Sequence, residues 1–206
     1  MNPITHAIIK KLHKDLVVIS KDGKEIIADT GVKLQQKTHQ LYSGTIKFED
    51  GSYRVIDTSK AEFIKDKFKG YKIGIFYKFV AELEMLKSVF GSELTTDLNE
   101  FNSTDKNIAL QYQSGKEGIS LKNANYLVAF NIDFSSSTYW QFRDRMTTID
   151  RKENTLFWIF SKGGIEHSIY KSVLNKKDYT LSCFRKDFNI HNEKIKPIKS
   201  KRYNNI

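Results

Sequence analysis

Residues 107–121 read Asn107-Ile-Ala-Leu-Gln-Tyr-Gln-Ser-Gly-Lys-Glu-Gly-Ile-Ser-Leu121 and are the most informative part of the sequence for the fold. It begins with an apolar segment, turns at two glycines, and leads to a second apolar segment and then to a segment rich in glutamine and arginine. This order can bring turn amides and a guanidinium to the carboxyl edge of a parallel sheet, where α/β folds commonly bind phosphates. The stretch therefore predicts an α/β fold with a phosphate-binding edge.

The surrounding chain alternates between patterns typical of strands and of helices. Strands are predicted at residues 72–77, 107–112, 126–130 and 155–160. Helices are predicted at residues 59–68, 79–90, 97–101, 136–147 and 164–174. Ser59 is the expected cap of the first helix. Strands and helices that alternate at this spacing favour a parallel sheet with helices on both faces, so we expect residues 59–178 to form one α/β lobe.

Residues 1–58 lack this alternation and contain two hairpin signals instead. Asp22-Gly23 and Asp50-Gly51 each separate two short apolar segments, as two-residue hairpin turns do. Helices are predicted at residues 4–16 and 32–42, the second ending at Gly44. We expect these residues to form a small N-terminal helix and hairpin appendage, and residues 179–206 to form a basic tail.

The composition favours a polyanionic partner. The 206 residues include 34 Lys and Arg against 24 Asp and Glu, which gives a formal charge of +10. Nucleic acid fits such a surface, although a lysine-rich surface can also serve solubility alone. Among the aromatic residues, Tyr112, Tyr139 and Trp140 could stack on bases, although most aromatic side chains fill a core.

The sequence predicts a soluble, cytoplasmic protein that does not contact membranes. Apolar runs such as residues 73–77 are too short to cross a bilayer, and no signal-like apolar region follows Met1. The single cysteine, Cys183, cannot form an internal disulfide, which fits a reducing compartment. The histidines are scattered without the spacing of metal ligands, so we expect no metal site within this chain.

Two groups of residues could carry chemistry, and the first is the turn that follows residue 112. Gly115 and Gly118 would let the backbone approach a ligand closely, and Lys116 supplies positive charge. Taken alone, a glycine pair after a strand is more often an ordinary turn.

The second group lies on the predicted helix at residues 136–147. Gln141 and Arg145 are four residues apart, so an amide and a guanidinium would share one face of the helix. Asp144 borders that face, whereas Arg143 points elsewhere. The alternative is a solvated helix with incidental salt bridges.

Taken together, the two groups resemble motifs V and VI in the C-terminal RecA-like lobe of superfamily 2 helicases, particularly the Swi/Snf-like branch and its phage-type members. In that family a strand leads into a Gly-x-x-Gly-x-x-Leu turn, a second strand ends near an aspartate and an aromatic residue, and a Gln-x-x-x-Arg-x-x-Arg helix follows. Residues 72–79 resemble motif IV, and residues 40–44 with the hairpin after them resemble the entry to this lobe. The residues that match motifs V and VI are Gly115, Gly118, Leu121, Asp133, Phe134, Gln141, Asp144 and Arg145.

The resemblance implies a role for particular positions. It implies that Arg145 is catalytic. The nucleotide-binding residues that it implies are Gly115, Glu117, Gly118, Gln141, Arg145 and Arg151. The nucleic-acid-binding residues that it implies are Lys78, Ser114 and Lys116. It also implies ATP and Mg as cofactors, held mainly by a separate phosphate-loop lobe or subunit, and DNA or RNA as the track.

Two departures from the family pattern limit these implications. The second arginine of motif VI falls on Thr148, and Arg151, three residues further on, could replace it. An arginine that stabilises the charge of phosphoryl transfer can be worth about a thousandfold or more in rate. The sequence also contains no Gly-x-x-x-x-Gly-Lys-Ser/Thr loop. We therefore expect no ATP hydrolysis by this chain alone.

Two interpretations remain open at this point. In the first, the chain is the second motor lobe of an ATP-dependent helicase or translocase, incomplete without a phosphate-loop lobe. In the second, it is a non-enzymatic module that binds nucleic acid or regulates a motor, as the loss of an arginine at Thr148 suggests.

Overall fold

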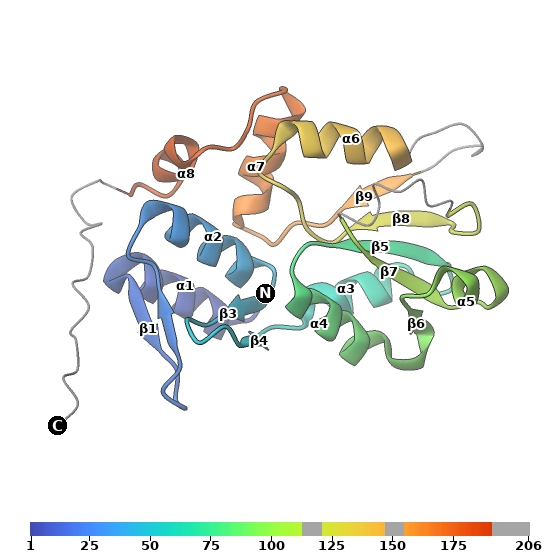
Figure 1. Cartoon of the computed structure of the whole chain (residues 1–206), viewed down its shortest axis with the longest axis horizontal. Helices are drawn as coiled ribbons and strands as arrows, with labels where there is room; N and C mark the ends of the chain where they lie inside the picture. Colours follow the sequence, from blue (N-terminus) through green and yellow to red (C-terminus); the bar gives the residue numbers. More distant parts are fainter. Residues whose placement is uncertain (113–120, 147–154, 191–206) are drawn as a thin grey trace.

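The computed structural model describes residues 1–112, 121–146 and 155–190, with the backbone alone for residues 144–146 (Figure 1). Its N-terminal part contains two helices and two antiparallel hairpins, so the elements predicted there are confirmed. They are α1 (Pro3–Asp15), β1 (Val17–Ile19), β2 (Glu25–Ile27), α2 (Gly31–Tyr42), β3 (Thr45–Lys47) and β4 (Tyr53–Val55).

The following part alternates between helices and strands, as predicted. Its elements are α3 (Ser59–Lys67), β5 (Ile73–Tyr77), α4 (Val80–Phe90), a 3-10 turn (Gly91–Glu93), β6 (Leu94–Thr95), α5 (Leu98–Ser103), β7 (Asn107–Gln111), β8 (Tyr126–Ala129), α6 (Ser136–Met146), β9 (Leu156–Trp158), α7 (Ile165–Leu174) and α8 (Leu181–Asp187). Neither β6 nor α8 was predicted from the sequence. A strand of two residues shows no alternation that could reveal it, and α8 lies in a polar, basic segment.

The five strands β5 to β9 form one parallel sheet in the order β6-β7-β5-β8-β9. The central strand is β5, in which Ile75 pairs with Ala109 of β7 on one side and with Val128 of β8 on the other. Helices α3 and α4 pack on one face of the sheet, and Phe101 of α5 and Phe142 of α6 pack on the other. Because both faces are covered, every residue of β5 is buried. The fold is RecA-like α/β.

The ends of the helices follow from local side chains. Asn2 caps α1 by accepting a hydrogen bond from the backbone N–H of Ile4, and Thr30 caps α2 through the N–H of Lys33. After α2 the chain turns at Gly44, whose φ of +86° favours glycine. A Cβ at Gly44 would lie 2.1 Å from the carbonyl oxygen of Asp57, so the close approach of these two segments also excludes a side chain there.

The expected cap of α3 was wrong by one residue. Ser59 is the first residue of the helix, and Thr58 occupies the capping position. The N–H of Ser59 donates to the Asp57 carboxylate (3.0 Å), which also accepts from the N–H of Asn2 (2.5 Å) and the hydroxyl of Thr5 (3.0 Å). One carboxylate therefore joins the N-termini of α1 and α3. Although burial raises the pKa of Asp57, these hydrogen bonds together lower it below its usual value.

The N-terminal part and the C-terminal helices share one hydrophobic core. Leu34 and Leu41 of α2 are fully buried in a cluster with Ile165 and Ile169 of α7 and Phe184 of α8. The N-terminal part is thereby packed beside the carboxyl edge of the sheet, where α7 also lies (Figure 1).

Candidate functional site

Residues that follow three strands come together at the carboxyl edge of the sheet. The backbone N–H of Phe130 donates to Phe76 O (2.8 Å), which places Asn131, after β8, beside Lys78, after β5. Gln111, at the end of β7, donates its side-chain amide to Lys78 O (3.3 Å). The strand ends thus form one surface, as predicted for a parallel sheet.

A buried carboxylate organises this edge. Glu82 of α4 accepts hydrogen bonds through Oε2 from the backbone N–H groups of Lys78 (2.7 Å) and Phe79 (2.9 Å). Its Oε1 accepts from Nδ2 of Asn131 (2.5 Å). Burial raises the pKa of Glu82, and these hydrogen bonds with the charge of Lys60 oppose the rise. Glu82 therefore fixes the turn after β5 relative to the end of β8.

His39 of α2 continues the network into the N-terminal part. Its Nε2 lies 2.5 Å from Oδ1 of Asn131, and its ring contacts those of Phe79 and Phe134, with centroids 5.3 and 4.8 Å away. Because Asn131 Oδ1 can only accept, Nε2 carries the proton. Burial, and next the charge of Lys78, hold the pKa of His39 well below its usual value, so the imidazole is neutral. Its Nδ1 is buried without a hydrogen-bond partner in the described part of the chain.

Lys78, a predicted nucleic-acid-binding residue, is paired at this edge. Its ammonium lies 2.5 Å from Oδ2 of Asp133 and 5.0 Å from the ring centre of Phe134. Oδ1 of Asp133 accepts from the backbone N–H of Ser135 (2.9 Å). The Lys78 and Asp133 side chains are 23% and 30% exposed, so a phosphate could reach the ammonium only in competition with the carboxylate.

A second ion pair is fully enclosed behind this edge. Lys60 of α3 lies 3.1 Å from Glu166 Oε1 of α7, with side-chain exposures of 6% and 0%. The Lys60 ammonium also lies 4.8 Å from the centre of the Phe130 ring. Oε2 of Glu166 has no hydrogen-bond partner among the described residues. The pair links α3, the end of β8 and α7.

The structure places two predicted site residues with their side chains. These are Lys78, at the strand edge, and Gln141, which is exposed on α6. The backbone of Arg145 is part of α6, and its side chain is not described. Arg145 follows Gln141 by four residues, so the two positions share one face of the helix. The predicted residues that fall outside the described part of the chain are Ser114, Gly115, Lys116, Glu117, Gly118 and Arg151, together with the departure at Thr148.

Leu121, the last residue of the motif V pattern, is buried against the sheet. A Cβ at Gly74 of β5 would lie 2.9 Å from Cδ1 of Leu121, so the glycine makes room for this side chain. The pattern of Gly115, Gly118 and Leu121 therefore ends in a core contact.

Sequence reasoning missed most of the buried polar network. Glu82 was detectable, because a glutamate at the third position of a helix commonly bonds to the backbone N–H groups before it. His39 and Asn131 are 92 residues apart and Lys60 and Glu166 are 106 apart, so no local pattern connects them.

The described residues offer no metal site of their own. In residues 1–112, 121–146 and 155–190, no group of three or more His, Cys, Asp or Glu side chains is placed to hold a metal ion. None of the described helices has the length and apolarity to span a bilayer.

Comparison with known proteins agrees with the geometry of this edge. Residues 55–149 match the family model of the helicase conserved C-terminal domain. The matched segment begins at the end of β4 and includes β5, β7, β8 and α6, whose ends build the edge. No protein with a curated description matches the chain.

Two solved structures are similar to parts of the chain. One is the C-terminal part of the Fun30 ATPase domain, at 19% identity and a TM-score of 0.43, covering 59% of this chain and 43% of that one. The other is the Sulfolobus solfataricus SWI2/SNF2 ATPase core domain, at 17% identity and a TM-score of 0.48, covering 88% of this chain and 42% of that one. The chain thus spans less than half the length of either structure.

The RecA-like sheet, the polar edge at its strand ends and the family match over residues 55–149 lead to one conclusion. Residues 55–149 are similar to the helicase conserved C-terminal domain, and they lie in a fold of RecA-like α/β type.

Proposed function

We propose that this chain is the second motor lobe of an ATP-dependent nucleic-acid translocase of the Swi/Snf type, and that it works only with a phosphate-loop lobe. The main support for the proposal is that the residues matching the helicase C-terminal domain include the strands whose ends form the carboxyl edge of the sheet. The Swi/Snf assignment rests on the order of Gly115, Gly118, Leu121, Gln141 and Arg145 along the sequence.

The proposed roles divide the edge between two ligands. Gln141 and Arg145 on one face of α6 would approach the nucleotide, together with Gly115, Glu117, Gly118 and Arg151. Lys78, Ser114 and Lys116 would approach phosphates of DNA or RNA. ATP with Mg would be held mainly by the other lobe, since the printed sequence contains no phosphate loop.

The buried network supports such a role for the edge by fixing its geometry. Glu82 and Asn131 hold the ends of β5 and β8 together, and His39 ties both to α2. Groups that stabilise charge in a transition state act best when they are held in place before the reaction. A rigid edge would therefore position Lys78 and the turn that follows β7.

A non-enzymatic module that binds nucleic acid or regulates a motor is the second candidate. Thr148 favours it, because this position carries an arginine in the family pattern and threonine cannot supply positive charge. The two candidates differ in one measurable property, which is ATP turnover in the presence of a phosphate-loop lobe.

The test measures magnesium-dependent ATP turnover with a 30-base-pair DNA duplex. The purified chain alone is expected to show none, and addition of a phosphate-loop lobe encoded with this chain is expected to produce turnover. Arg145→Ala should then reduce the turnover by about a hundredfold or more, because a charge-stabilising arginine is lost. Lys11→Ala, which removes a positive charge at an exposed position of α1, is the control.

Two results would contradict the proposal. Turnover by the isolated chain that disappears in Arg145→Ala would mean that no other lobe is needed. DNA binding without turnover in the presence of the phosphate-loop lobe would favour the non-enzymatic module.

A further inference from the structure

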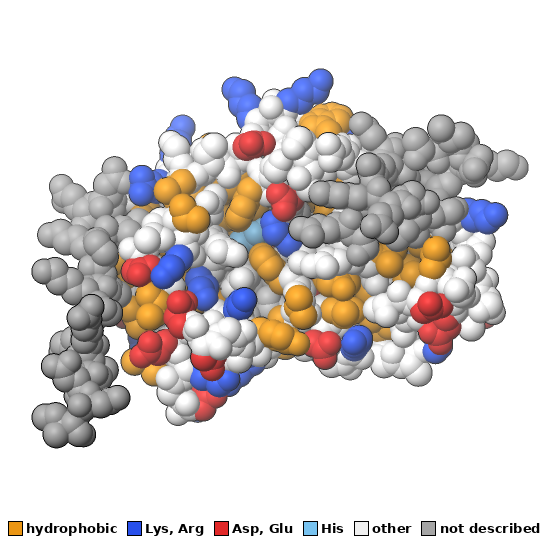
Figure 2. All heavy atoms as spheres, in the orientation of Figure 1, with side chains coloured by type: hydrophobic (Ala, Val, Ile, Leu, Met, Phe, Trp, Pro, Cys, Tyr) orange, Lys and Arg blue, Asp and Glu red, His pale blue; other side chains and the backbone are white. Residues whose placement is uncertain are grey.

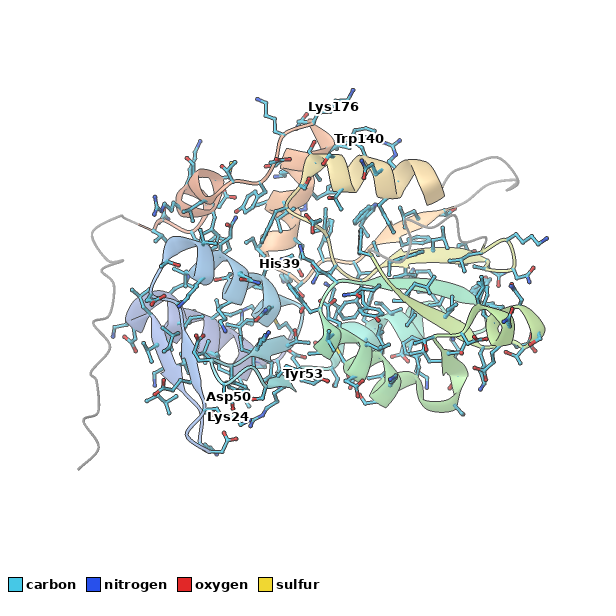
Figure 3. The ribbon with its side chains drawn as sticks, viewed as in Figure 1. Lys24, His39, Asp50, Tyr53, Trp140 and Lys176 are labelled. Atoms are coloured by element: carbon cyan, nitrogen blue, oxygen red, sulfur yellow. The ribbon has the colours of Figure 1, made fainter. Side chains whose placement is uncertain are left out.

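The outer surface of α6 and α7 carries a group of positive charges around one tryptophan. Trp140 donates its indole N–H to Val173 O (2.9 Å), which fixes the ring on the last turn of α7. The Arg143 guanidinium lies 4.8 Å from the ring centre and the Lys176 ammonium lies 5.6 Å from it. Figure 3 shows Trp140 and Lys176 together where α6 meets the loop after α7. We call Trp140, Arg143, Lys171, Lys176 and Lys177 the α6–α7 basic surface.

Three carboxylates from the described part of the chain have partners outside this surface. Asp178 accepts a hydrogen bond from the backbone N–H of Ser136 (2.7 Å) at the start of α6. Asp187 accepts from the hydroxyl of Tyr179 (2.8 Å), and Glu166 is buried with Lys60. No carboxylate among the described residues forms an ion pair with Lys171, Lys176 or Lys177, and all three lysines are exposed. Lys and Arg side chains accordingly project from this end of the molecule in Figure 2.

The backbone at Lys176 points to a use for its side chain. Lys176 follows α7 with φ of +56°, in the left-handed region where helices most often end on glycine. Its N–H donates to Val173 O (3.0 Å), and that of Lys177 donates to Ser172 O (3.1 Å), which closes the helix. Glycine would close it with less strain. The lysine instead holds a cation over Trp140.

Two cations compete with base stacking on this ring. Arg143 and Lys176 both lie within cation–π distance of Trp140, so the ring organises charges and is not a free platform for a base. Tyr112 and Tyr139 are 8% and 2% exposed, so the other two aromatic residues considered for stacking are buried. The surface can therefore contact the phosphate backbone but cannot read bases by stacking.

We propose that the α6–α7 basic surface is a second nucleic-acid contact of this chain, which binds the phosphate backbone without sequence preference. The surface faces away from the sheet, because Phe142, two residues after Trp140, packs inward on Phe76 and Tyr112. It is therefore separate from the strand-end edge that contains Lys78. The formal charge of +10 favours nucleic acid over an acidic protein as its partner. The inference rests on the proposed function only in taking the track to be nucleic acid.

The test compares two triple variants that each remove three positive charges. The first is Lys171→Ala/Lys176→Ala/Lys177→Ala. The matched control is Lys10→Ala/Lys11→Ala/Lys14→Ala, on exposed positions of α1 that are far from α6 and α7 in Figure 1. Fluorescence anisotropy with a labelled 30-base-pair duplex gives the affinity at several salt concentrations.

The first variant is expected to lower the affinity for DNA by about tenfold or more at 0.1 M salt. The slope of log affinity against log salt should become shallower by about two to three, because each lost phosphate contact lowers this slope by about 0.9. The control is expected to change the affinity by less than about threefold and the slope by less than one. Equal losses in both variants, or no binding by the unchanged chain at low salt, would overturn the proposal.

Lys176→Gly separates binding from folding. It removes the cation and relieves the left-handed conformation, so the thermal midpoint should stay the same or rise while DNA affinity falls by about twofold to threefold. Unchanged affinity in this variant would contradict the role of Lys176. Equal affinities for two duplexes of different sequence are expected, and a tenfold preference would contradict backbone binding. Binding of polyglutamate as tight as that of DNA would overturn the choice of nucleic acid.

Failure of this inference is distinct from failure of the motor proposal. If only Lys78→Ala weakens DNA binding, the α6–α7 basic surface is excluded and the strand-end edge remains. If only the α6–α7 variant weakens it, the surface stands and the role of Lys78 is lost. ATP turnover with a phosphate-loop lobe is measured separately from both.

Discussion

The strand-end edge and the pair of N-terminal hairpins use the same residue types in opposite ways. At the edge and behind it, Lys60, Glu82 and Glu166 are buried: Lys60 pairs with Glu166, and Glu82 accepts hydrogen bonds from backbone N–H groups and from Asn131. At the hairpins, Lys24 pairs with Asp50 (3.2 Å) and Arg54 with Asp22 (2.6 Å) at sites open to solvent. Figure 3 shows Lys24 and Asp50 at the rim of the molecule and His39 near its centre.

The difference teaches that burial decides what a charge contributes to stability. A charge in a low-dielectric interior must be paired, and removal of one partner is costly because the other remains unsolvated. A solvated pair at the surface gains little, since water competes for each charge. We therefore expect substitutions of charged residues to change stability strongly at the edge and weakly at the hairpins.

The largest effect is expected at the buried ion pair. Glu166→Gln leaves the Lys60 ammonium enclosed without an opposite charge, so the free energy of unfolding should fall by about 3–5 kcal/mol. Lys60→Met/Glu166→Gln removes both charges and should recover most of this loss. Urea unfolding of the two single variants and the double variant gives the coupling. Additive losses in the double variant would show that the pair is not coupled.

The next effect is expected at Glu82. The Glu82 carboxylate accepts hydrogen bonds from two backbone N–H groups and from the Asn131 amide. In Glu82→Gln the new side-chain NH₂ group would face one of these donors. The unfolding free energy should fall by about 1–3 kcal/mol. Glu82→Gln/Asn131→Asp exchanges amide and carboxylate, so each donor again meets an acceptor. Urea unfolding should show recovery in the double variant, and its absence would contradict the assigned hydrogen bonds.

A smaller effect is expected from acidification. Burial lowers the pKa of His13 from 6.5 to about 4, and its ring lies against those of Phe184 and Phe188. The unfolded chain therefore binds more protons between pH 6.5 and 4, so stability is full above pH 6.5 and falls as the pH drops through this window. His39, whose pKa is also lowered, acts in the same direction.

His13→Gln tests this contribution. When the pH falls from 6.5 to 4.5, the free energy of unfolding of the variant should decrease by about 1–2 kcal/mol less than that of the unchanged chain, after allowance for the partial exposure of the His13 ring. Urea unfolding at several pH values measures the difference. Parallel curves for the two proteins would show that His13 does not contribute.

The smallest effect is expected at the hairpins. Hydrogen bonds from Ser52 lower the pKa of Asp50, but about half of this side chain is exposed to solvent. Asp50→Asn should leave the urea midpoint unchanged within measurement error at neutral pH, because solvent and salt screen the pair. A clear destabilisation by this variant would erase the contrast between the hairpins and the edge.

Much of the fold follows from local patterns that the sequence displays. The Asp-Gly turns at 22–23 and 50–51 predicted both hairpins, and the apolar segments predicted four strands of the sheet. The glycine turn predicted after residue 112 and the helix predicted at residues 136–147 also indicated a site at the carboxyl edge of the sheet. The assignments of Arg145, Gly115 and Gly118 came from the resemblance to a family and stay predictions.

Most of the helices, strands and turns could be predicted from local patterns, because hydrophobic periodicity, caps and turn residues act over a few positions. The packing of the whole chain places β5 between β7 and β8 and brings His39 to Asn131 and Lys60 to Glu166, which no local pattern shows. The same holds for the cations at Trp140, which come from α6 and from the loop after α7. These contacts join residues distant along the chain, and burial in a shared core fixes which of them can meet.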